Sequence, residues 1–561
     1  MEIHSSLTPE SVRVAAEQTA AYLLKTQLSD GRWVGKLSSS CEATACAVIA
    51  LYLTGREQYA QQIQRGLAWL LQTQHSDGGW GDAVSDPSNI NATSLAISTL
   101  HLISAPEHKA ALERGLVILE RLGGWDAVRD QRYCTLSGVC RTVAALVGLL
   151  PWSGLQDLPF EVILLPKGLY RKISITLPGF LALAMMQHTY RPAPIGRRLL
   201  RSLAKPRVVR WLRQAQAPNG SYEESPLLNA LVVIGLTAGN IRGASEIIRS
   251  SLHYILEHQR EDGSWPIDRD LETSNTHNSI LALHELGYDL QLPRFQRTKE
   301  WLLASQFLEP FFATGAPGGG WSWAVPGGWP DTDDTAYNLK ALIALGLSPQ
   351  HPQLKKGIAW ELALQNDDGS WSTFVPNSTL PFDQPCPYVT AHVLSGLRAT
   401  GLFTANSEPV RRAIDWLRGR QEADGSFTGL WFRNYTCATA FVLEAMAEYG
   451  LADDLMARRC RNWLLDNQNP DGSWGGHIGQ PGTPEETSWA IAALLLAGLS
   501  PTHRSIERGT AWLVNNQRPD GTWEPSIIGL YFRSLWYSDS YYAIAFPLKA
   551  LALYLKRMEA M

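Results

Sequence analysis

The chain has 561 residues, of which 45% are hydrophobic and 18% charged, and its formal net charge at pH 7 is −4. This length is too great for one ordinary domain and predicts two large ones, each able to bury a substantial core. The near-neutral charge excludes a global basic field for nucleic acid, so any contact with a polyanion or a membrane has to come from a local patch.

The N-terminal residues and the cysteines favour a cytoplasmic location. Nothing at the start of the chain resembles a signal peptide, and no apolar run approaches the roughly 20 residues that a membrane-spanning helix needs. The odd number of cysteines includes no Cys-x-x-Cys pair, which favours reduced thiols over a disulfide framework. The seven are Cys41, Cys46, Cys134, Cys140, Cys386, Cys437 and Cys460.

A repeated motif runs through most of the chain. An aromatic residue lies five positions before a glutamine that opens Gln-x-x-x-Gly-x-Trp, as in Trp360, Gln365 and Trp371. An amphipathic stretch precedes each copy and an apolar stretch follows it, so each repeat predicts a helical hairpin. Such hairpins close into an α/α barrel or stack as a solenoid, and the fold class is therefore all-α. The copies and variants open at Gln27, Gln74, Gln216, Gln259, Gln306, Gln365, Gln421, Gln468 and Gln517.

The spacing of these copies divides the chain into two predicted domains. No clear copy lies between Gln74 and Gln216, which predicts a degenerate α/α barrel over residues 15–250. A more regular α/α barrel is expected over residues 251–561, packed with residues 1–14. The motif residues are interpreted as structural, because the ring can stack on the amide and the amide can tie one helix end to the next. The copy at Gln306 is interpreted as having lost its glycine-tryptophan half.

Residues 160–213 combine apolar clusters with basic residues. The clusters lie at 162–165 and 177–186, and eight arginines and lysines follow from Arg191 to Arg213 without an acidic residue. This pattern suits a peripheral, monotopic membrane contact, and the same cations could hold the phosphates of a prenyl diphosphate. A buried helix beside a solvated basic helix explains the pattern equally well.

The sequence Asp-Thr-Asp-Asp at residues 331–334 places three carboxyl groups at the predicted start of a helix. Asp-rich helix starts are common caps. However, carboxyls this close cannot all ionise cheaply, so at least one is expected to stay protonated at neutral pH. The loop at 318–330 brings Trp321, Trp323 and Trp329 near the acid, and aromatic faces stabilise cations. The combination predicts an acid that starts carbocation chemistry.

The spacing of the repeats connects His392 with this acid. Asp333 lies 27 residues after Gln306, and His392 lies 27 residues after Gln365. Matching positions in adjacent repeats are usually neighbours, so His392 is expected to hydrogen-bond Asp333 and to stabilise the carboxylate that remains after proton transfer. A histidine satisfied at a helix start is the alternative.

A zinc site is the alternative to an acid paired with His392. Asp383, Cys386 and His392 offer suitable atoms within ten residues, but their spacing is unusual and no fourth ligand is evident. We therefore expect no metal.

The chain resembles a known family. The Gln-x-x-Asp-Gly-x-Trp repeats, the motif at 331–336 and Val-Thr-Ala-His-Val-Leu at 389–394 are similar to those of class II terpene cyclases, with squalene-hopene cyclases the nearest well-known group. The likeness covers almost the whole chain. It implies two α/α barrels with a cavity between them, and protonation that needs no metal or organic cofactor.

The resemblance also implies roles for individual residues. Asp333 matches the proton donor, Asp331 and Asp334 match its flanking carboxylates, and His392 matches the histidine that pairs with the donor. The residues implied to line the substrate cavity are Trp323, Trp329, Trp431, Tyr435, Cys437, Tyr531, Trp536 and Tyr542.

Some positions depart from the pattern of hopene cyclases. Tyr388 stands where an aspartate precedes the histidine, Cys437 replaces a tyrosine near the acid, and Ser274-Asn275 replaces a Trp-Asp pair. The network that returns a proton to the acid is therefore expected to differ, as is part of the cavity lining.

The sequence predicts an enzyme that protonates and cyclises a linear isoprenoid, with squalene as the first candidate. The alternatives are a cyclase of farnesyl or geranylgeranyl diphosphate that keeps the diphosphate, and a non-catalytic isoprenoid-binding or prenyltransferase-like protein. The expected partners are the hydrophobic substrate, a membrane surface reached through residues 160–213, and a second copy in a homodimer, but no nucleic acid. The expected location is the cytoplasm, attached to the inner face of the membrane.

Overall fold

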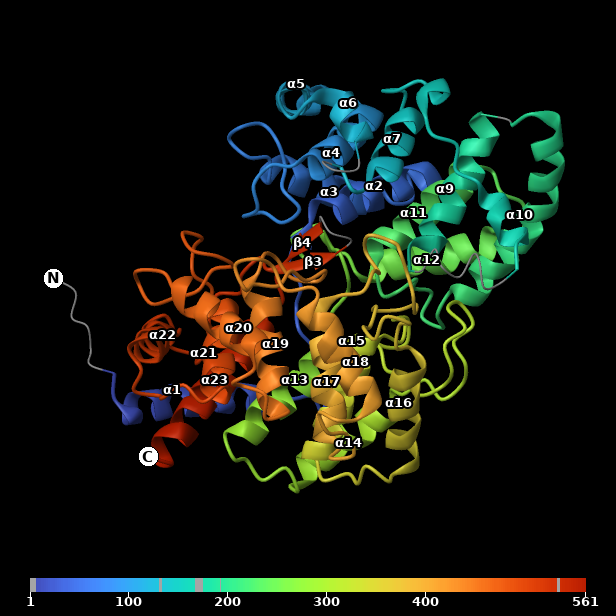
Figure 1. Ribbon diagram of the computed structural model, residues 1–561. Coiled ribbons are helices and arrows are strands. Elements are labelled where there is room, and N and C mark those ends of the chain that lie inside the picture. Colours follow the sequence, from blue (N-terminus) through green and yellow to red (C-terminus); the bar gives the residue numbers. More distant parts are fainter. Residues whose placement is uncertain (1–6, 131–133, 167–174, 192, 532–534) are drawn as a thin grey trace.

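The computed structural model describes residues 7–130, 134–166, 175–191, 193–531 and 535–561, and these residues are almost entirely helical. The helices form two lobes, one above the other in Figure 1, with a small β-hairpin between them. The all-α prediction is confirmed, and each lobe is a ring of inner helices surrounded by outer ones.

The first lobe contains the helices between the motif at Gln27 and residue 257. Its inner ring runs through α2, α4, α7, α9 and α11, and the remaining helices pack outside it. The bounds are α2 (Cys41–Gly55), α3 (Ala60–Gln72), α4 (Ile90–Ile103), η1 (Pro106–His108), α5 (Lys109–Arg121), α6 (Gly124–Arg129), α7 (Ser137–Leu146), η2 (Trp152–Gly154), η3 (Phe160–Leu164), α9 (Leu177–Tyr190), α10 (Ile195–Ala215), α11 (Pro226–Ala238) and α12 (Ser245–Glu257). The irregularity predicted between Gln74 and Gln216 corresponds to the short helices α6 and α7 and the 3-10 turns.

The second lobe is the more regular ring. Its inner helices α13, α15, α17, α19, α21 and α23 each pack against the next, and α23 returns to α13 to close the ring. The bounds are α13 (Glu272–Glu285), α14 (Pro293–Ala304), α15 (Thr332–Ala344), α16 (Pro352–Ala363), α17 (Pro387–Ala399), α18 (Glu408–Arg418), α19 (Thr436–Glu448), α20 (Leu455–Asp466), α21 (Pro484–Leu496), α22 (Arg504–Asn515) and α23 (Tyr542–Glu559).

Helix α1 (Pro9–Thr26) belongs to this second ring in its packing, because it lies against α22 and α23. Gln517 Nε2 donates to the Ala15 carbonyl oxygen at 2.9 Å, which ties the last motif to the first helix. Residues 15–26 therefore lie with the second lobe and not, as expected from the sequence, with the first. The residues of α12 that follow position 250 pack on α11 in the first lobe.

The structure has two short antiparallel strand pairs, one between distant segments of the chain and one in a local hairpin. Strand β1 (Ser39–Ser40) pairs with β2 (Trp265–Pro266), and β3 (Gly529–Tyr531) pairs with β4 (Leu535–Tyr537). The β3–β4 hairpin lies between the lobes (Figure 1), since its Gly529 bridges to Phe432 and the Trp536 amide donates to Asp82 Oδ2 at 3.0 Å. The hairpin thus connects the two lobes.

The repeated motif closes each helical hairpin through side-chain hydrogen bonds. Gln365 Nε2 donates to the carbonyl oxygens of Gly369 and Pro409, both at 2.8 Å, and Trp371 Nε1 donates to the Glu361 carbonyl oxygen at 2.8 Å. The predicted link between helix ends through the amide is therefore present. The indole adds a bond of its own to the preceding helix.

The motif at Gln306 corrects one interpretation. Gln306 Nε2 donates to the carbonyl oxygen of Gly319 at 2.7 Å, and Trp321 Nε1 donates to that of Leu302 at 2.6 Å. The glycine-tryptophan half is thus present at Gly319 and Trp321, displaced by the inserted loop and not lost. Trp321 is fully buried, as the motif tryptophans are.

The structure also revises the interpretation of residues 160–213, of which 167–174 and 192 lie outside the described residues. The apolar run at 177–186 forms most of helix α9 and is buried in the first lobe except for Phe180, whereas Thr189 and Tyr190 at the end of the helix are exposed. Arg201 is buried between Asp157 and Glu161, at 2.9 and 2.8 Å. The exposed apolar residues lie instead on α10, where Ile195, Leu199 and Leu203 are 78%, 65% and 64% exposed.

Along the described ranges, every helix is too short or too polar to span a bilayer.

We predict that Gln365→Ala lowers the free energy of unfolding by about 2 kcal/mol, because two hydrogen bonds to buried helix ends are lost at about 1 kcal/mol each. Thermal and urea unfolding followed by circular dichroism would measure the change. Gln350→Ala, at an exposed position, is the matched control and should leave the stability of the protein unchanged. An equal effect of the two substitutions would contradict this role of the motif.

Candidate active site

The three carboxyl groups lie at the first turn of α15, which two backbone contacts hold in place. Asp331 is the N-cap: its Oδ1 accepts from the Asp334 amide at 2.7 Å, as expected of an aspartate before a helix. Its own amide donates to the Trp321 carbonyl oxygen at 2.9 Å, and the Thr332 amide donates to that of Thr373 at 3.0 Å. The acid motif is thus anchored to the motif tryptophan of its own repeat and to the next repeat.

The carboxyls of Asp331 and Asp334 are turned into the protein. Asp334 Oδ1 accepts from Ser274 Oγ at 2.6 Å and lies 3.1 Å from His277 Nε2. Asp331 is 2% exposed, and its Oδ2 has no hydrogen-bond partner among the described residues. Burial, and then the charges of Asp334 and Asp333, raise the pKa of Asp331 well above its usual value. Burial therefore favours the protonated form of Asp331 over the carboxylate.

Asp333 differs from its neighbours because its side chain is 21% exposed, and it lines a cavity. Its Oδ1 is in close contact with Nδ1 of His392, on α17 of the next repeat. The contact between Asp333 and His392 that the repeat spacing predicts is therefore present in the structure. Ser274 and His277 were not identified as partners of the motif from the sequence.

His392 is held between aromatic rings. Its ring stacks on Tyr337 at a centroid distance of 3.9 Å and contacts Tyr388 at 4.2 Å and Phe441 at 4.4 Å. Burial lowers the pKa of His392, and the nearby Asp333 carboxylate opposes that effect. Tyr388 stands where hopene cyclases have an aspartate, and its ring packs against His392 in place of that charged partner. The ring packing fixes the orientation in which His392 meets Asp333.

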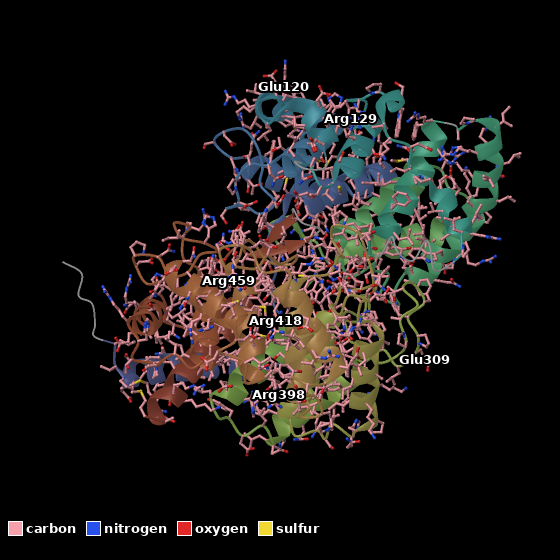
Figure 2. The ribbon with its side chains drawn as sticks, in the orientation of Figure 1. Glu120, Arg129, Glu309, Arg398, Arg418 and Arg459 are labelled. Carbon is pink, nitrogen blue, oxygen red and sulfur yellow. The ribbon has the colours of Figure 1, made fainter. Side chains whose placement is uncertain are left out.

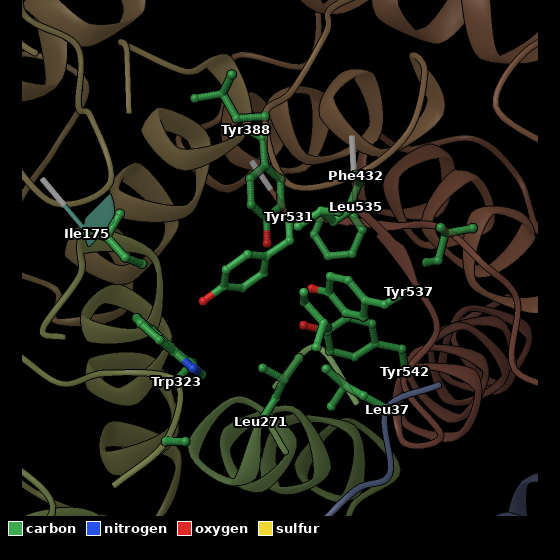
Figure 3. Close-up of a cluster of buried hydrophobic side chains, with 14 of the residues drawn as sticks. Leu37, Ile175, Leu271, Trp323, Tyr388, Phe432, Tyr531, Leu535, Tyr537 and Tyr542 are labelled. Atoms are coloured by element: carbon green, nitrogen blue, oxygen red, sulfur yellow. The ribbon is translucent and has the colours of Figure 1, made fainter. Parts of the chain in front are cut away.

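The cavity beside Asp333 has about 670 Å³ of space between its lining atoms, part of which is open solvent. Figure 3 shows its aromatic wall, to which Trp323, Tyr388, Phe432 and Tyr531 contribute. The full lining is Leu271, Ser274, His277, Asn278, Trp323, Asp331, Asp333, Asp334, Thr373, Phe374, Tyr388, His392, Trp431, Phe432, Tyr531, Tyr537, Tyr542 and Phe546.

Half of the aromatic and cysteine positions expected in this lining are found there, namely Trp323, Trp431, Tyr531 and Tyr542. The other half lie elsewhere. Trp329 packs against Phe311 at 5.4 Å and Tyr435 against Trp463 at 6.1 Å. Cys437 is buried in α19, and Trp536 in β4 contacts Asp82 through its amide. These four are expected from their position along the chain, which does not say toward which side a residue points.

The lining residues missed from the sequence include Phe374, Phe432 and Tyr537. A signal for the first two existed, because in three repeats a residue shortly after the motif aromatic lines the cavity. Trp323 follows Trp321, Phe374 follows Trp371, and Phe432 follows Phe427. In a closed ring the corresponding loops of successive repeats converge at one end. The position of Phe374 and Phe432 after the motif aromatic was therefore a sequence signal that they line the cavity.

The lining is apolar apart from its carboxyls, hydroxyls and imidazoles. Among the described residues that surround the cavity there is no lysine or arginine. Charged side chains such as Glu120, Glu309 and Arg398 project from the outside of the lobes (Figure 2). The cavity therefore suits an uncharged organic molecule, with an acid at one place in its wall.

The residues weighed for zinc are engaged separately. Asp383 Oδ1 accepts from the Phe374 amide at 2.9 Å, while His392 contacts Asp333. Burial raises the pKa of Cys386 to about 11, so its thiol stays protonated. All seven cysteines lie within the described ranges as buried free thiols, and in those ranges no group of three or more His, Cys, Asp or Glu side chains could hold a metal ion.

Comparison with protein families gives matches along nearly the whole chain. The squalene-hopene cyclase C-terminal domain matches residues 272–556, just over half of the chain. The squalene-hopene cyclase N-terminal domain matches residues 16–176, and the prenyltransferase alpha-alpha toroid domain matches residues 164–318.

Individual relatives are more distant. A squalene-hopene cyclase of Bradyrhizobium diazoefficiens is 31% identical over 272 residues, which are 41% of this chain and 40% of that protein. The squalene-hopene cyclase of Alicyclobacillus acidocaldarius is 26% identical over 97% of both chains. Against several other high-ranking relatives the chain spans less than half of their length, for example 47% of an enfumafungin synthase of Hormonema carpetanum.

Among solved structures, ent-copalyl diphosphate synthase from Streptomyces platensis superposes with a TM-score of 0.63 at 21% identity, over 97% of this chain and 99% of that one. At this identity the likeness shows that the two chains share a fold.

We predict that Asp331→Asn leaves the protein at least as stable as the parent at pH 7. The pKa of Asp331 is raised in the folded state above its unfolded value of about 3.9, so its stabilising effect is full below pH 4 and declines as the pH rises toward the folded-state pKa. Asparagine caps a helix as well as aspartate and cannot ionise.

Melting temperatures between pH 4 and pH 8 would test this prediction. The gain of Asp331→Asn over the parent should grow with pH, whereas the exposed control Asp367→Asn should show no such trend. A variant that melts below the parent at pH 7 would show that the Asp331 carboxylate is stabilising.

Proposed function

The chain belongs to the class II terpene cyclase superfamily, and we propose that it cyclises a linear isoprenoid by protonating a terminal carbon–carbon double bond with Asp333. One observation carries the proposal: of the three carboxyls in the cavity wall, Asp333 has the most exposed side chain and is the one that contacts His392. The double bond takes the carboxyl proton, and a tertiary carbocation forms.

The neighbours of Asp333 support its role as the acid. Donation of a hydrogen bond from His392 Nδ1 stabilises the carboxylate that remains after the proton has left. Asp334 is fixed by Ser274 and His277, and burial favours the protonated form of Asp331, which lowers the negative charge of the motif. Less negative charge around Asp333 before transfer and a donor after it both favour the reaction.

The rings around the cavity support the steps that follow. Trp323 meets Phe374 at 5.9 Å, Phe374 meets Trp431 at 6.0 Å, and Trp431 meets Tyr531 at 5.8 Å between centroids. Such a continuous row stabilises a positive charge as it moves along the folded polyene, at about 0.5–2 kcal/mol for each ring face in a desolvated site. Successive ring closures then pass through tertiary cations.

We propose an uncharged isoprenoid, squalene first, as the substrate. The lining offers carboxyls and no cationic side chain, so a diphosphate inside it would be desolvated without a partner. The similar proteins from Bradyrhizobium diazoefficiens and Alicyclobacillus acidocaldarius are named squalene-hopene cyclases.

The second candidate is a prenyl diphosphate cyclase, either of farnesyl or of geranylgeranyl diphosphate. The Streptomyces platensis protein that shares the fold is named ent-copalyl diphosphate synthase and matches this chain over almost all of its length. A non-catalytic isoprenoid-binding or prenyltransferase-like protein is the third candidate. The intact Asp333–His392 contact argues against it, because a binding role does not need an acid.

We further propose that α10 brings the protein to a membrane surface, from which a hydrocarbon substrate would enter. Ile195, Leu199 and Leu203 form an exposed apolar stripe on this helix, and Arg198 stands beside it. Figure 1 shows α10 at the outer edge of the first lobe, accessible to a flat surface. We therefore propose that the protein attaches to the inner face of the cytoplasmic membrane. The homodimer expected from the sequence stays a prediction.

The domain division is likewise proposed in revised form: a first barrel from α2 to α12, and a second barrel from α13 to α23 that takes α1 as an outer helix.

Purified protein in detergent should convert squalene to a cyclic product, which gas chromatography with mass spectrometry would identify. Farnesyl and geranylgeranyl diphosphate are incubated in parallel and analysed after phosphatase treatment. Asp333→Asn should lower the rate by about a thousandfold, within the range expected for removal of a general acid, and the control Asp367→Asn should not. Product from a diphosphate alone would replace squalene with the second candidate, and none from any polyene would favour the binding role.

Replacing both Leu199 and Leu203 with glutamate should weaken binding to lipid vesicles by more than about tenfold, because each buried leucine contributes about 1.5–3 kcal/mol. Co-sedimentation with vesicles of phosphatidylcholine, with and without phosphatidylglycerol, measures the effect. Leu455→Glu is the control, since Leu455 is 64% exposed on α20 of the other lobe. Equal binding of all variants would exclude α10 as the contact.

A further inference from the structure

Two tryptophans line the cavity, Trp323 and Trp431, and they are fixed in different ways. Trp431 Nε1 donates a hydrogen bond to Thr373 Oγ1 at 2.9 Å. The Trp431 carbonyl oxygen accepts from the Leu530 amide of strand β3, also at 2.9 Å. The main chain of Trp431 is therefore tied to the β3–β4 hairpin and its ring to Thr373. Because both ends of the residue are held, the orientation of the ring in the cavity wall is fixed.

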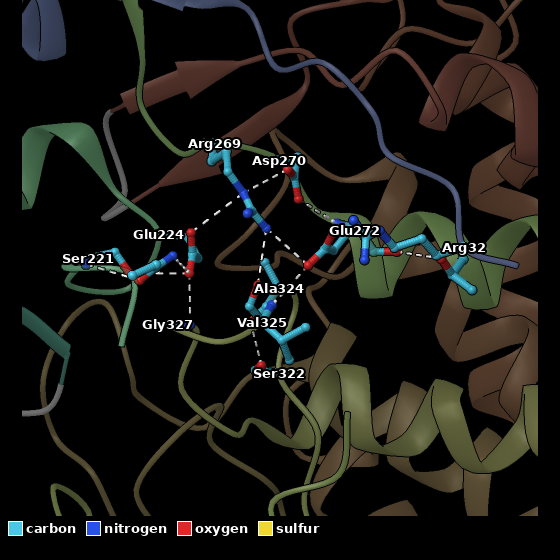
Figure 4. A network of polar contacts seen from close by, with 12 residues as sticks. Arg32, Ser221, Glu224, Arg269, Asp270, Glu272, Ser322, Ala324, Val325 and Gly327 are labelled. Carbon is cyan, nitrogen blue, oxygen red and sulfur yellow. Dashed lines mark hydrogen bonds and ion pairs between the residues drawn. The ribbon is translucent and has the colours of Figure 1, made fainter. Parts of the chain in front are cut away.

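Trp323 shows that the fold does not require such a bond. Its indole N–H has no hydrogen-bond partner among the described residues. The loop that carries Trp323 is held through its backbone instead (Figure 4). The Val325 carbonyl oxygen accepts from Arg269 Nη2 at 3.1 Å, and the Gly327 amide donates to Glu224 Oε1 at 2.8 Å. Arg269 forms ion pairs with three carboxylates, those of Glu224, Asp270 and Glu272.

Other buried tryptophans repeat this observation. Indole N–H groups without a partner in the described part of the chain occur at Trp211, Trp360, Trp416 and Trp489. Burial of the N–H alone therefore does not explain the hydrogen bond of Trp431. This bond joins two residues that both line the cavity, Trp431 and Thr373, so its position connects it with the substrate.

Thr373 belongs to a segment that is itself fixed to the acid motif. The amide and the hydroxyl of Thr332, inside the motif, donate to the carbonyl oxygens of Thr373 and Ser372 at 3.0 and 2.9 Å. The amide of the motif tryptophan in the same segment donates to Thr390 Oγ1 at 3.0 Å, on the helix that carries His392. The segment thus connects the starts of α15 and α17. Through Thr373 the ring of the cavity tryptophan has a fixed place relative to the acid and its histidine.

From these contacts we propose that Thr373 is a positioning residue for the cyclisation, because its hydroxyl holds the Trp431 ring where the cation meets it. The inference rests on the proposed function. A ring face stabilises a cation best when it is in place before the charge arrives, since a ring that must first turn loses part of that stabilisation. Thr373 acts through Trp431 and transfers no proton. It determines the share of cations that reach the later ring closures, and so the product.

The test compares the products of the parent with those of Thr373→Val, which has the same shape without the hydroxyl. The variant keeps Asp333 and the backbone carbonyl that holds Thr332, so it should still consume squalene. We expect the share of the parent's main product to fall by about threefold or more, in favour of products with fewer rings, because a ring that is free to turn stabilises the cation less. Gas chromatography with mass spectrometry measures the shares. If the parent cyclises a prenyl diphosphate instead of squalene, the same comparison uses that substrate.

Two further variants separate this role from a direct contact of Thr373 with the substrate. Thr373→Ser keeps a hydroxyl and should restore the product ratio of the parent. Trp431→Phe has no N–H, so that Thr373→Val should cause no further change in that background. A further shift in the double variant would show that the hydroxyl acts on the substrate itself, and the proposal would be wrong.

Thr487→Val is the matched control. Thr487 is a buried threonine on α21 whose hydroxyl accepts from the Trp474 amide at 3.0 Å, and it is not among the residues that line the cavity. Its loss should lower the melting temperature and leave the product ratio unchanged. A shift in ratio equal to that of Thr373→Val would show a structural effect and overturn the role of Thr373.

The hydrogen bond can also be tested without a substrate, by nuclear magnetic resonance of protein with isotope-labelled tryptophan. The indole N–H signal of Trp431 is the one that disappears in Trp431→Phe. In Thr373→Val this signal should move upfield, because hydrogen-bonded protons resonate downfield, and in Thr373→Ser it should stay near its position in the parent. A signal that does not move in Thr373→Val would contradict the inference, whether or not the protein cyclises squalene.

The remaining outcomes separate this inference from the function on which it rests. A signal that moves, together with an unchanged product ratio in Thr373→Val, overturns the role of Thr373 alone. Thr373→Ala also lacks the hydroxyl and decides the question by the same comparison if Thr373→Val fails to fold. A parent that forms no product from squalene, farnesyl diphosphate or geranylgeranyl diphosphate overturns the proposed function itself and this inference with it.

Discussion

The cost of keeping carboxyl groups out of water governs the organisation of this protein. An ionised carboxylate in an apolar interior costs several kcal/mol unless it is paired or hydrogen-bonded. At the start of α15 the helix end, Ser274 and His277 meet that cost for Asp334, and burial favours the protonated form of Asp331. The side chain of Asp333 is more exposed, at 21% against 11% for Asp334, and it contacts His392 in the cavity wall. The same constraint that shapes the site therefore selects the residue that can act as an acid.

The closed ring of the second lobe explains why one acid faces so many aromatic rings. Each repeat ends its outer helix with the same glutamine and aromatic residue, and the loop that follows leads into the next inner helix. Because the inner helices close on themselves, these loops meet at one end. Trp323, Phe374 and Phe432 come from three such loops, and the β3–β4 hairpin adds Tyr531 and Tyr537. Because the repeats close into a ring, their loops together form a cavity lined by aromatic residues.

The charges around this chamber are arranged in separate groups. The acid motif and His392 lie in the cavity wall, whereas Arg269 and its carboxylate partners are not among the residues that line it. Apart from the acid motif and His392 the wall is largely aromatic, and ring faces of this kind stabilise a nearby cation. The apolar stripe on α10 is in the other lobe and is kept apart from this chemistry.

The sequence by itself determined the helical hairpins, the ring of the second lobe and the meeting of Asp333 with His392, since the motif is local and its spacing repeats. Tertiary structure decided the rest. Gly319 and Trp321 complete the motif of Gln306 across an inserted loop, and α1 joins the far end of the chain. Trp329, Tyr435, Cys437 and Trp536 are not among the residues that line the cavity, although they are near its lining in sequence. Which residues reach the cavity wall depends on how segments hundreds of residues apart pack together, and no local pattern records that packing.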